Sequence, residues 1–301
     1  MRSSTDASTQ VCEYTIHHGP SFVPFNRRLA LNDQPTAAPP LPSLADLGPE
    51  LSRITTTQRI VSVIIPFACA ALYFLFASLR LWPLAVLMLM YLSFVTYGSI
   101  SHDLVHRTLG LPRAWNESLL TLVELLAFRS GHAYRLAHLH HHARFPHDDD
   151  IEGAAARMSF GRTLLEGIIF QPRIMLWALA RPHRARPLVI VEVLVVISLL
   201  TACLTIRSTP IFAVYALLMI MGSWVIPLIT SYVPHNPQGQ TPLAQTRLFR
   251  GRVLSIIALQ HLYHLEHHLY PSVPHQNWPK LASRLDPYFK AAGVEPIVLG
   301  R

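Results

Sequence analysis

The chain has 301 residues, of which 51% are hydrophobic and only 14% charged, and its formal net charge is +8. This composition is too apolar for an ordinary water-soluble protein, and the apolar residues are concentrated in blocks. The basic residues cluster beside these blocks instead of forming a continuous stripe, so we expect an integral membrane protein with no nucleic-acid partner.

The first 55 residues are rich in serine, threonine and proline, which predicts a disordered or loosely attached leader, with one membrane domain over 56–301. The start of the chain is polar and does not resemble a cleavable signal peptide. The pair His17 and His18 lies here, where solvated side chains are the expectation. Cysteine usage indicates nothing further, since Cys12, Cys69 and Cys203 form no CxxC pair.

Four apolar runs are long enough to cross a hydrocarbon core of about 30 Å, which takes about 20 helical residues. They are 60–78, 84–101, 188–206 and 211–232. Glu192 is the clear charge inside them, and an ionisable residue in a span usually faces the protein interior. We therefore predict an all-α fold with four transmembrane helices arranged as two hairpins.

The loops within the two hairpins carry only Arg80 and Arg207 among the 25 basic residues. The positive-inside rule then places both termini and the long 102–187 connection in the cytoplasm, in what we expect to be a bacterial inner membrane. Some attraction to anionic lipid follows from the basic excess. Within the connection, the interrupted apolar segments 118–128 and 163–180 are expected to lie in the membrane interface.

Fourteen of the seventeen histidines fall within 102–147 or 235–275, and eight of them form three short boxes. The boxes are His102-Asp-Leu-Val-His106, His138-Leu-His-His141-His142 and His264-Leu-Glu-His267-His268. On a helix, residues three and four apart share a face, so each box can aim its imidazoles at a common point. Eight imidazoles exceed what one tetrahedral zinc can use, so we predict a two-metal site held by a cytoplasmic helical cap.

The other histidines are weaker candidates. His140 lies about 200° around the helix from His138, so we expect it to be solvated or to support a ligand. His261 precedes His264 by three and shares its face. His235 closes the fourth span on the side of the boxes, where an interfacial role is equally open. The unpaired histidines are expected to be structural or surface residues: His132, His147, His183 and His275.

Carboxylates lie beside the boxes and could accept the second N–H of a ligating histidine, which fixes its tautomer and orientation. They are Asp103, Asp148, Asp149, Asp150, Glu152 and Glu266. Part of the aspartate run is expected to be a solvated loop.

The motif set HDxxH, HxxHH and HxxHH, with Leu269-Tyr-Pro271 after the third box, resembles the membrane fatty acid desaturase superfamily over roughly residues 60–285. That superfamily also includes carotenoid hydroxylases and ketolases. The resemblance implies a di-iron centre that activates O2, oxidises an unactivated C–H bond of a lipid and draws two external electrons. It implies nine ligands, because His235 fits the place of a further histidine after the last span. The set is His102, His106, His138, His141, His142, His235, His264, His267 and His268.

The substrate is less clearly indicated than the centre. Fatty acyl desaturation is our first expectation, and the Val233-Pro-His-Asn-Pro237 segment also resembles carotenoid ring hydroxylases and ketolases. The chain shows no GxGxxG motif for a flavin or nicotinamide and no haem-binding electron-carrier motif. A separate donor such as a ferredoxin with its reductase is therefore expected, and arginine-rich cytoplasmic segments could dock it.

Two other classes of protein could concentrate histidine in a membrane. A metal transporter should place its ligands near the bilayer midplane, whereas these boxes lie at one surface. A membrane zinc hydrolase needs an open coordination position and a general base, and the chain carries no HExxH motif. Both are less consistent with the pattern than an oxygen-dependent lipid-modifying enzyme.

Overall fold

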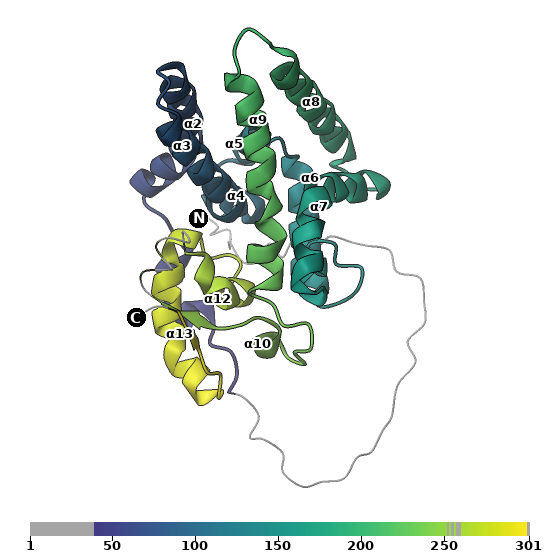
Figure 1. Cartoon of the computed structure of the whole chain (residues 1–301). Helices are drawn as coiled ribbons and strands as arrows, with labels where there is room; N and C mark the ends of the chain where they lie inside the picture. Colours follow the sequence, from purple (N-terminus) through teal and green to yellow (C-terminus); the bar gives the residue numbers. More distant parts are fainter. Residues whose placement is uncertain (1–38, 252, 254–255, 257–259, 300–301) are drawn as a thin grey trace, which may run out of the picture. The chain divides into compact units, whose positions relative to one another are not determined.

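In the computed structural model of the chain, the described residues are 39–251, 253, 256 and 260–299. They are mostly helical (Figure 1). The predicted leader lies outside the described residues over 1–38. The elements from the first to the last long apolar helix are α2 (Thr56–Ser78), α3 (Trp82–Val95), η2 (Thr96–Ile100), α4 (Ser101–His106), α5 (Arg113–Leu126), α6 (Gly131–Arg144), η3 (Gly153–Arg157), α7 (Phe160–Ala180), α8 (Arg186–Thr205), α9 (Ile211–Trp224) and η4 (Leu228–Tyr232).

The remaining elements are short. They are α1 (Leu44–Leu47), η1 (Pro49–Ser52), α10 (Pro242–Gln245), β1 (Phe249–Arg250), η5 (His261–Tyr263), α12 (His264–Leu269), η6 (His275–Asn277), α13 (Trp278–Ala291) and β2 (Ile297–Val298). The two strands form a parallel two-residue ladder. In Figure 1 the hairpins α2–α3 and α8–α9 lie at one end, α12 and α13 lie at the other, and α4 and α6 lie between them.

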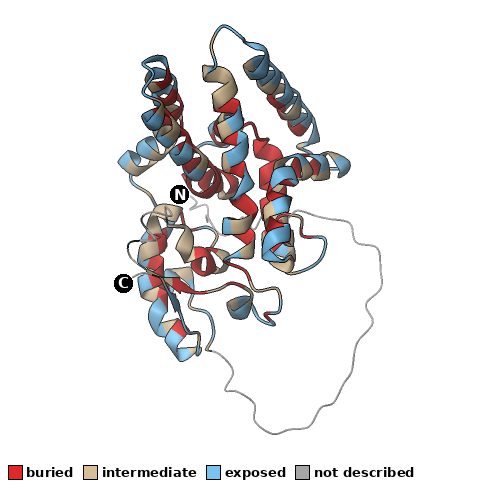
Figure 2. Ribbon diagram, viewed as in Figure 1, coloured by how far each residue is buried: buried red, intermediate tan, exposed pale blue. Residues whose placement is uncertain are grey.

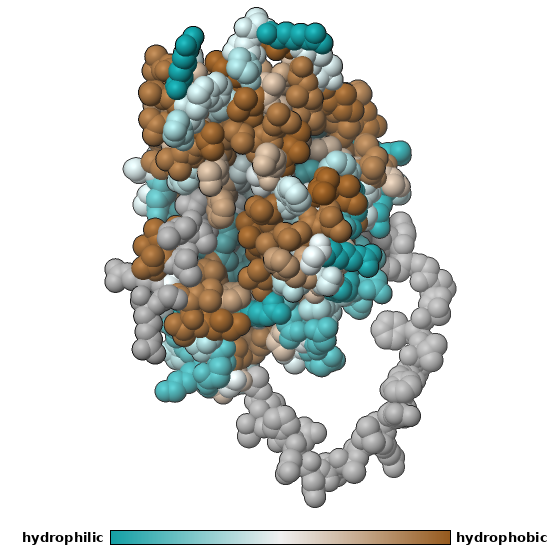
Figure 3. Space-filling model, viewed as in Figure 1, coloured by the Kyte–Doolittle hydropathy of each residue, from teal (hydrophilic) through white to brown (hydrophobic). Residues whose placement is uncertain are grey.

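The hairpin helices present apolar side chains outward, as a lipid-facing surface requires. Leu75 is 50% exposed, Leu87 is 52% and Leu194 is 59%. Figure 2 shows the exposed faces of these helices, and Figure 3 shows that the exposed residues over this end are predominantly hydrophobic. Exposure of such a large apolar surface to water is unfavourable, so the arrangement fits an integral membrane protein.

Among the described residues, five helical segments, one more than the sequence prediction, are long and apolar enough to cross a membrane. They are Pro49–Ser78, Trp82–His106, Phe160–Ala180, Arg186–Thr205 and Ile211–Tyr232. Four of them contain or nearly coincide with the predicted spans. The additional one, Phe160–Ala180, covers the segment 163–180 that we expected to lie in the interface. Length and composition do not distinguish the two placements, because Glu166 and Arg173 pair within this helix at 2.8 Å and so reduce the cost of either charge in an apolar environment.

Two π-helical turns interrupt the spans at corresponding places. The turn η2 precedes α4, which carries His102, and η4 ends three residues before His235. A π-turn adds a residue to the helical repeat and so rotates all following side chains, and such turns are frequent at functional sites. Both therefore change the helix phase just before histidines of the predicted set.

The buried polar residues include Glu192, the one clear charge predicted within a span. It is only 3% exposed, as expected for an inward-facing group. Its carboxylate accepts hydrogen bonds from Ser130 Oγ at 2.6 Å, from the His132 backbone N–H at 3.1 Å and from Thr121. These bonds tie α8 to α5 and to the start of α6, the helix of the second box.

A second hydrophobic cluster packs the end of the chain against residues that precede the first span. Leu47 of α1 and Leu51 of η1 are buried with Leu281 and Phe289 of α13. Asn277 donates to the carbonyl of Leu51 at 2.8 Å. We assigned 39–55 to the leader, but these residues belong to the compact unit that begins at Ala38.

Candidate metal centre

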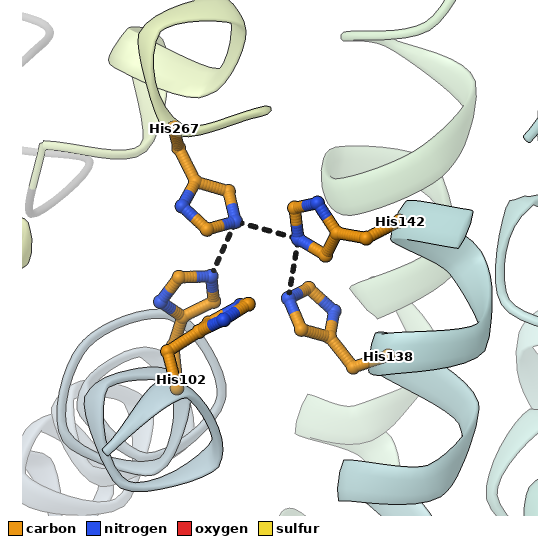
Figure 4. A group of neighbouring side chains, drawn as sticks. His102, His138, His142 and His267 are labelled. Carbon is orange, nitrogen blue, oxygen red and sulfur yellow. Dashed lines mark hydrogen bonds between the residues drawn. The ribbon is translucent and has the colours of Figure 1, made fainter. Parts of the chain in front are cut away.

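Five histidines from three separate segments converge at one point between α4, α6 and α12. In Figure 4, the rings of His102, His138, His142 and His267 point toward one another. The Nε2 atom of His267 lies 2.9 Å from Nε2 of His102 and 2.8 Å from Nε2 of His142. The fifth member is His106, and one ring nitrogen from each of the five lies within 4.8 Å of the others. We call these five residues group A.

Four further histidines form a second cluster, group B, which consists of His141, His235, His264 and His268. The Nε2 atom of His235 is its centre, 3.1 Å from His141, 3.0 Å from His268 and 3.3 Å from His264. All nine histidines of the predicted set are therefore brought together, and none of them lies outside these groups.

The second and third boxes each divide between the groups, and this corrects our expectation that each box would aim at a single point. In α6 the i, i+4 pair His138 and His142 enters group A, while His141 enters group B. In α12 the pair His264 and His268 enters group B, while His267 enters group A. The physical reason is helix geometry, because residues four apart differ by about 40° around the axis while adjacent residues differ by about 100°. Each box therefore spans two clusters and holds them side by side.

Three histidines are oriented through their Nδ1 atoms. His138 Nδ1–H donates to Glu152 at 3.0 Å, and His141 Nδ1–H donates to Asp150 at 2.8 Å. His235 Nδ1–H donates to the carbonyl of Ser231 at 3.0 Å. Since a carboxylate or carbonyl oxygen can only accept, these contacts keep the proton on Nδ1 and leave the Nε2 lone pair directed into the cluster.

Among the candidate carboxylates, only Glu152 and Asp150 contact a histidine of the two groups through a ring nitrogen. Asp103 instead accepts from the Nδ1–H of His275 at 2.7 Å. Glu266 pairs with Arg250 at 2.6 Å. The reason is again helix phase, since Asp103 and Glu266 each adjoin a clustered histidine and so point about 100° away from it. In the aspartate run, Asp149 pairs with Arg144, and the fully exposed Asp148 fits the expected solvated loop.

Electrostatics keeps most of the clustered imidazoles neutral, the form that binds a metal ion. Burial and then the neighbouring imidazoles hold the pKa values of His142, His264, His267 and His268 well below the usual range. His141 differs, because the Asp150 carboxylate outweighs the effect of burial and raises its pKa. Burial raises the pKa of Glu266 to about 7, against the opposing effect of Arg250.

The donor set fits a pair of first-row metal ions. Two nitrogen atoms that bind one metal ion at about 2.1 Å each, with a right angle between the two bonds, lie about 3 Å apart. The Nε2–Nε2 distances within both groups match this value. Neutral imidazoles whose lone pairs face one another at this distance repel unless a proton or cation lies between them. In addition, the buried Nε2 atom of His106 has no hydrogen-bond partner among the described residues. These observations fit two adjacent ions, held by five and four imidazoles.

The other histidines of the described residues lie outside both groups. The ring of His140 lies 5.2 Å from that of Trp177 and is tilted by 57° to it. His132 is buried between Glu192 and Glu117, at 2.8 and 3.1 Å, and His275 contacts Asp103. His183 donates to the carbonyl of Ala178 at 3.0 Å. His261 lines the same cavity as His102 and His264 without joining a group. His147 is exposed, and His17 and His18 lie outside the described residues.

Sequence reasoning missed several residues that enclose the centre. Trp278 is 1% exposed, and its ring lies 5.1 Å from that of His267 and 5.3 Å from that of His102. Tyr97 donates from its hydroxyl to Glu152 at 3.0 Å, and its ring packs 4.5 Å from that of Tyr134. Tyr134 precedes His138 by four residues on α6, so helical spacing could have linked it to the second box. Trp278 and Tyr97 come from α13 and η2, and no local spacing could have linked them to the histidines that they approach.

Comparison with known proteins bears on the chemistry of this centre. A family model described as fatty acid desaturase matches residues 76–298, which include all nine clustered histidines. No curated protein matches the chain at a significant level.

Proposed function

Because the chain belongs to the fatty acid desaturase family, we propose that it is a membrane-bound di-iron oxidoreductase that oxidises an unactivated C–H bond of a lipid hydrocarbon chain. Desaturation or hydroxylation of a hydrocarbon is the general chemistry of the family. Fatty acyl desaturation is the specific reaction that we propose. The observation that carries the proposal is the convergence of nine imidazoles into two adjacent groups beside an apolar, membrane-facing part of the chain.

In this proposal His102, His106, His138, His142 and His267 hold one iron and His141, His235, His264 and His268 hold the other. Imidazole is a suitable iron ligand, and nine of them leave no thiolate or carboxylate in the set. When bound, such an iron pair with O2 and two external electrons supplies the oxidising power that C–H cleavage needs.

The chain's own residues prepare the site. Glu152 and Asp150 fix the tautomers of His138 and His141, so the imidazoles need no rearrangement to bind. The buried rings of Trp278, Tyr97 and Tyr134 limit the access of water from three elements. The Tyr97 hydroxyl holds Glu152 in place, which connects the π-turn η2 to the second box.

We further propose that both termini and the centre face the cytoplasm, with the two predicted hairpins in the bilayer. Electrons would then come from a separate cytoplasmic donor such as a ferredoxin with its reductase. The short basic segment Arg181–Arg186, which connects α7 to α8 and includes Arg184, is one surface with charge suited to an acidic donor.

The test is expression of the full chain with a ferredoxin and its reductase in a host that makes both fatty acids and carotenoids, followed by lipid and pigment analysis. New double bonds in acyl chains support the first choice. Oxygenated carotenoids instead favour a ring hydroxylase or ketolase of the same superfamily. Metal uptake into cells without any oxidised lipid would favour the transporter alternative and contradict the proposal.

A further inference from the structure

Two cavities adjoin each other next to the metal centre, and one of them opens toward the membrane. The membrane-side cavity is a small hollow between α3 with η2 and the segment from α9 to η4. Phe94, Val225 and Ile229 line it, and they are 37%, 42% and 37% exposed. Because these residues lie in candidate membrane spans, the mouth of this cavity faces lipid.

The second, metal-side cavity is lined by histidines of both groups. His102 and His138 come from group A, and His141 and His264 come from group B. A substrate atom placed here lies beside both clusters. This cavity is therefore the part of the described molecule where a hydrocarbon must arrive to be oxidised.

Three residues line both cavities and so form the boundary between them: Tyr97, Thr230 and His261. Two of them are fixed by hydrogen bonds, since Tyr97 donates to Glu152 and Thr230 Oγ1 donates to the Ile226 carbonyl at 2.8 Å. The ring of His261 makes no hydrogen bond to any other described residue. It also stands on η5, a turn of three residues, and so is the least constrained of the three.

The His261 ring occupies the space that a side chain at position 98 would take. A Cβ atom at Gly98 would lie 1.1 Å from Nε2 of His261 and 1.8 Å from its Cε1. The ring therefore packs directly on the bare backbone of the π-turn η2. Only glycine at position 98 permits this packing, which places the ring across the passage between the cavities.

A second glycine brings the walls of the mouth together. A Cβ at Gly222 of α9 would lie 2.4 Å from Oγ and 3.0 Å from Cβ of Ser93 on α3. The two helices thus approach closely at the mouth of the membrane-side cavity. Because the helices are so close, the mouth is narrow, and a disulfide between positions 93 and 222 could close it.

On the basis of the proposed function, we propose that a lipid hydrocarbon chain enters laterally from the bilayer between α3 and α9 and displaces the His261 ring to reach the metal pair. The apolar, lipid-exposed mouth suits a hydrocarbon chain and no polar ligand. The boundary ring determines how far the chain penetrates, so His261 is a specificity-determining residue and not a ligand.

The test uses palmitic acid with a terminal diazirine, photoactivated on the purified full chain in bilayer nanodiscs and mapped by mass spectrometry. In the wild type we expect label mainly on peptides of the membrane-side cavity. In His261→Ala we expect a several-fold shift of label toward peptides that contain Tyr134 and Trp278. His147→Ala, which removes an exposed histidine, should leave the distribution as in the wild type. An unchanged distribution in His261→Ala overturns the proposal.

A second measurement tests the lateral route without altering the boundary. Ser93→Cys and Gly222→Cys are combined in a chain whose Cys12, Cys69 and Cys203 are replaced by serine. The two Cβ positions are 3.0 Å apart before any relaxation, so the helices need to separate by less than about 1 Å to reach the roughly 3.8 Å of a disulfide. Oxidation should remove label from the peptides that line both cavities, and reduction should restore it, while Ser93→Cys alone should not respond. Full labelling of the oxidised double variant overturns the lateral route.

Photolabelling requires neither O2 nor electrons, so it can test the route of the hydrocarbon chain independently of the proposed lipid oxidation. A chain that labels as expected but oxidises no lipid contradicts only the proposed function. A chain that oxidises lipid but shows no redistribution of label in His261→Ala contradicts only the inference drawn from the cavities.

Discussion

His141 and His142 are adjacent in sequence, yet their Nε2 atoms belong to different histidine groups. His141 lies 3.1 Å from His235, and His142 lies 2.8 Å from His267. One turn of α6 therefore forms part of both groups, and α12 does the same with His267 and His268. This sharing fixes the two groups side by side, which is what a reaction needing two cooperating metal ions requires.

The division into groups predicts the effect of removing single ligands. His138→Ala removes a ligand from group A and His268→Ala removes one from group B, so each variant should contain less iron. Loss of a residue that only supports a ligand costs up to about 100-fold in activity, so loss of a ligand itself should reduce lipid oxidation by more than about 100-fold. His140→Ala is the matched control from the same helix and should retain iron and substantial activity. Iron analysis and product analysis of the three purified variants check this. Complete loss of iron in His140→Ala would show that the helical-face argument is wrong.

Glu152 supports His138 and also accepts the Tyr97 hydroxyl. Glu152→Gln removes the charge that holds the Nδ1 proton of His138, so we expect iron affinity to fall about 10- to 100-fold. The measurement is iron titration of the purified variant. Asp148→Asn is the control, because Asp148 is a fully exposed carboxylate of the same loop. Equal affinity in both variants would contradict the role given to Glu152.

The ion pair of Arg129 and Glu124 is buried, with side chains 1% and 0% exposed and an N–O distance of 2.9 Å. Arg129→Met leaves the Glu124 carboxylate without its cation, which costs about 3–5 kcal/mol of folding free energy. The double variant Arg129→Met with Glu124→Gln should recover part of this loss, because no uncompensated charge is left. Thermal unfolding in detergent compares the variants, and a double variant less stable than Arg129→Met would argue against the pair's role.

His132 gives the fold a pH dependence. Burial opposes its charged form, but the Glu117 and Glu192 carboxylates outweigh burial and raise the pKa of His132 to about 9. Since the pKa in the unfolded chain is about 6.5, this contribution to stability is fully present below about pH 6.5 and is lost as the pH rises through about 9.

His132→Gln should therefore reduce the loss of thermal stability between about pH 6.5 and pH 9.5 that the wild type shows. Unfolding temperatures in detergent at several pH values measure it, with His147→Gln as the exposed control. Identical pH profiles for the wild type and His132→Gln would refute the assignment.

The features that sequence could predict are those set by local spacing. Apolar runs of sufficient length locate α2, α3, α8 and α9, and helical spacing places the members of each box on neighbouring faces. The structure brings all nine predicted histidines together. Their role as iron ligands stays a prediction.

Other features depend on how helices pack, which spacing within one segment does not determine. The rotation of α6 relative to α12 decides which histidine joins which group, and the π-turns η2 and η4 alter the phase of the elements that follow them. The same holds for Asp103, whose carboxylate contacts His275, 172 residues away. The role of 163–180 as a span or an interfacial helix depends on neighbours that the segment's own sequence does not specify.

The most direct test of the central claim is metal analysis of the purified chain combined with an oxygen-dependent assay of lipid oxidation. We predict two iron ions per chain and oxidised lipid that forms only with O2 and an electron donor. Stoichiometric zinc together with an activity that does not need O2 would contradict the di-iron account.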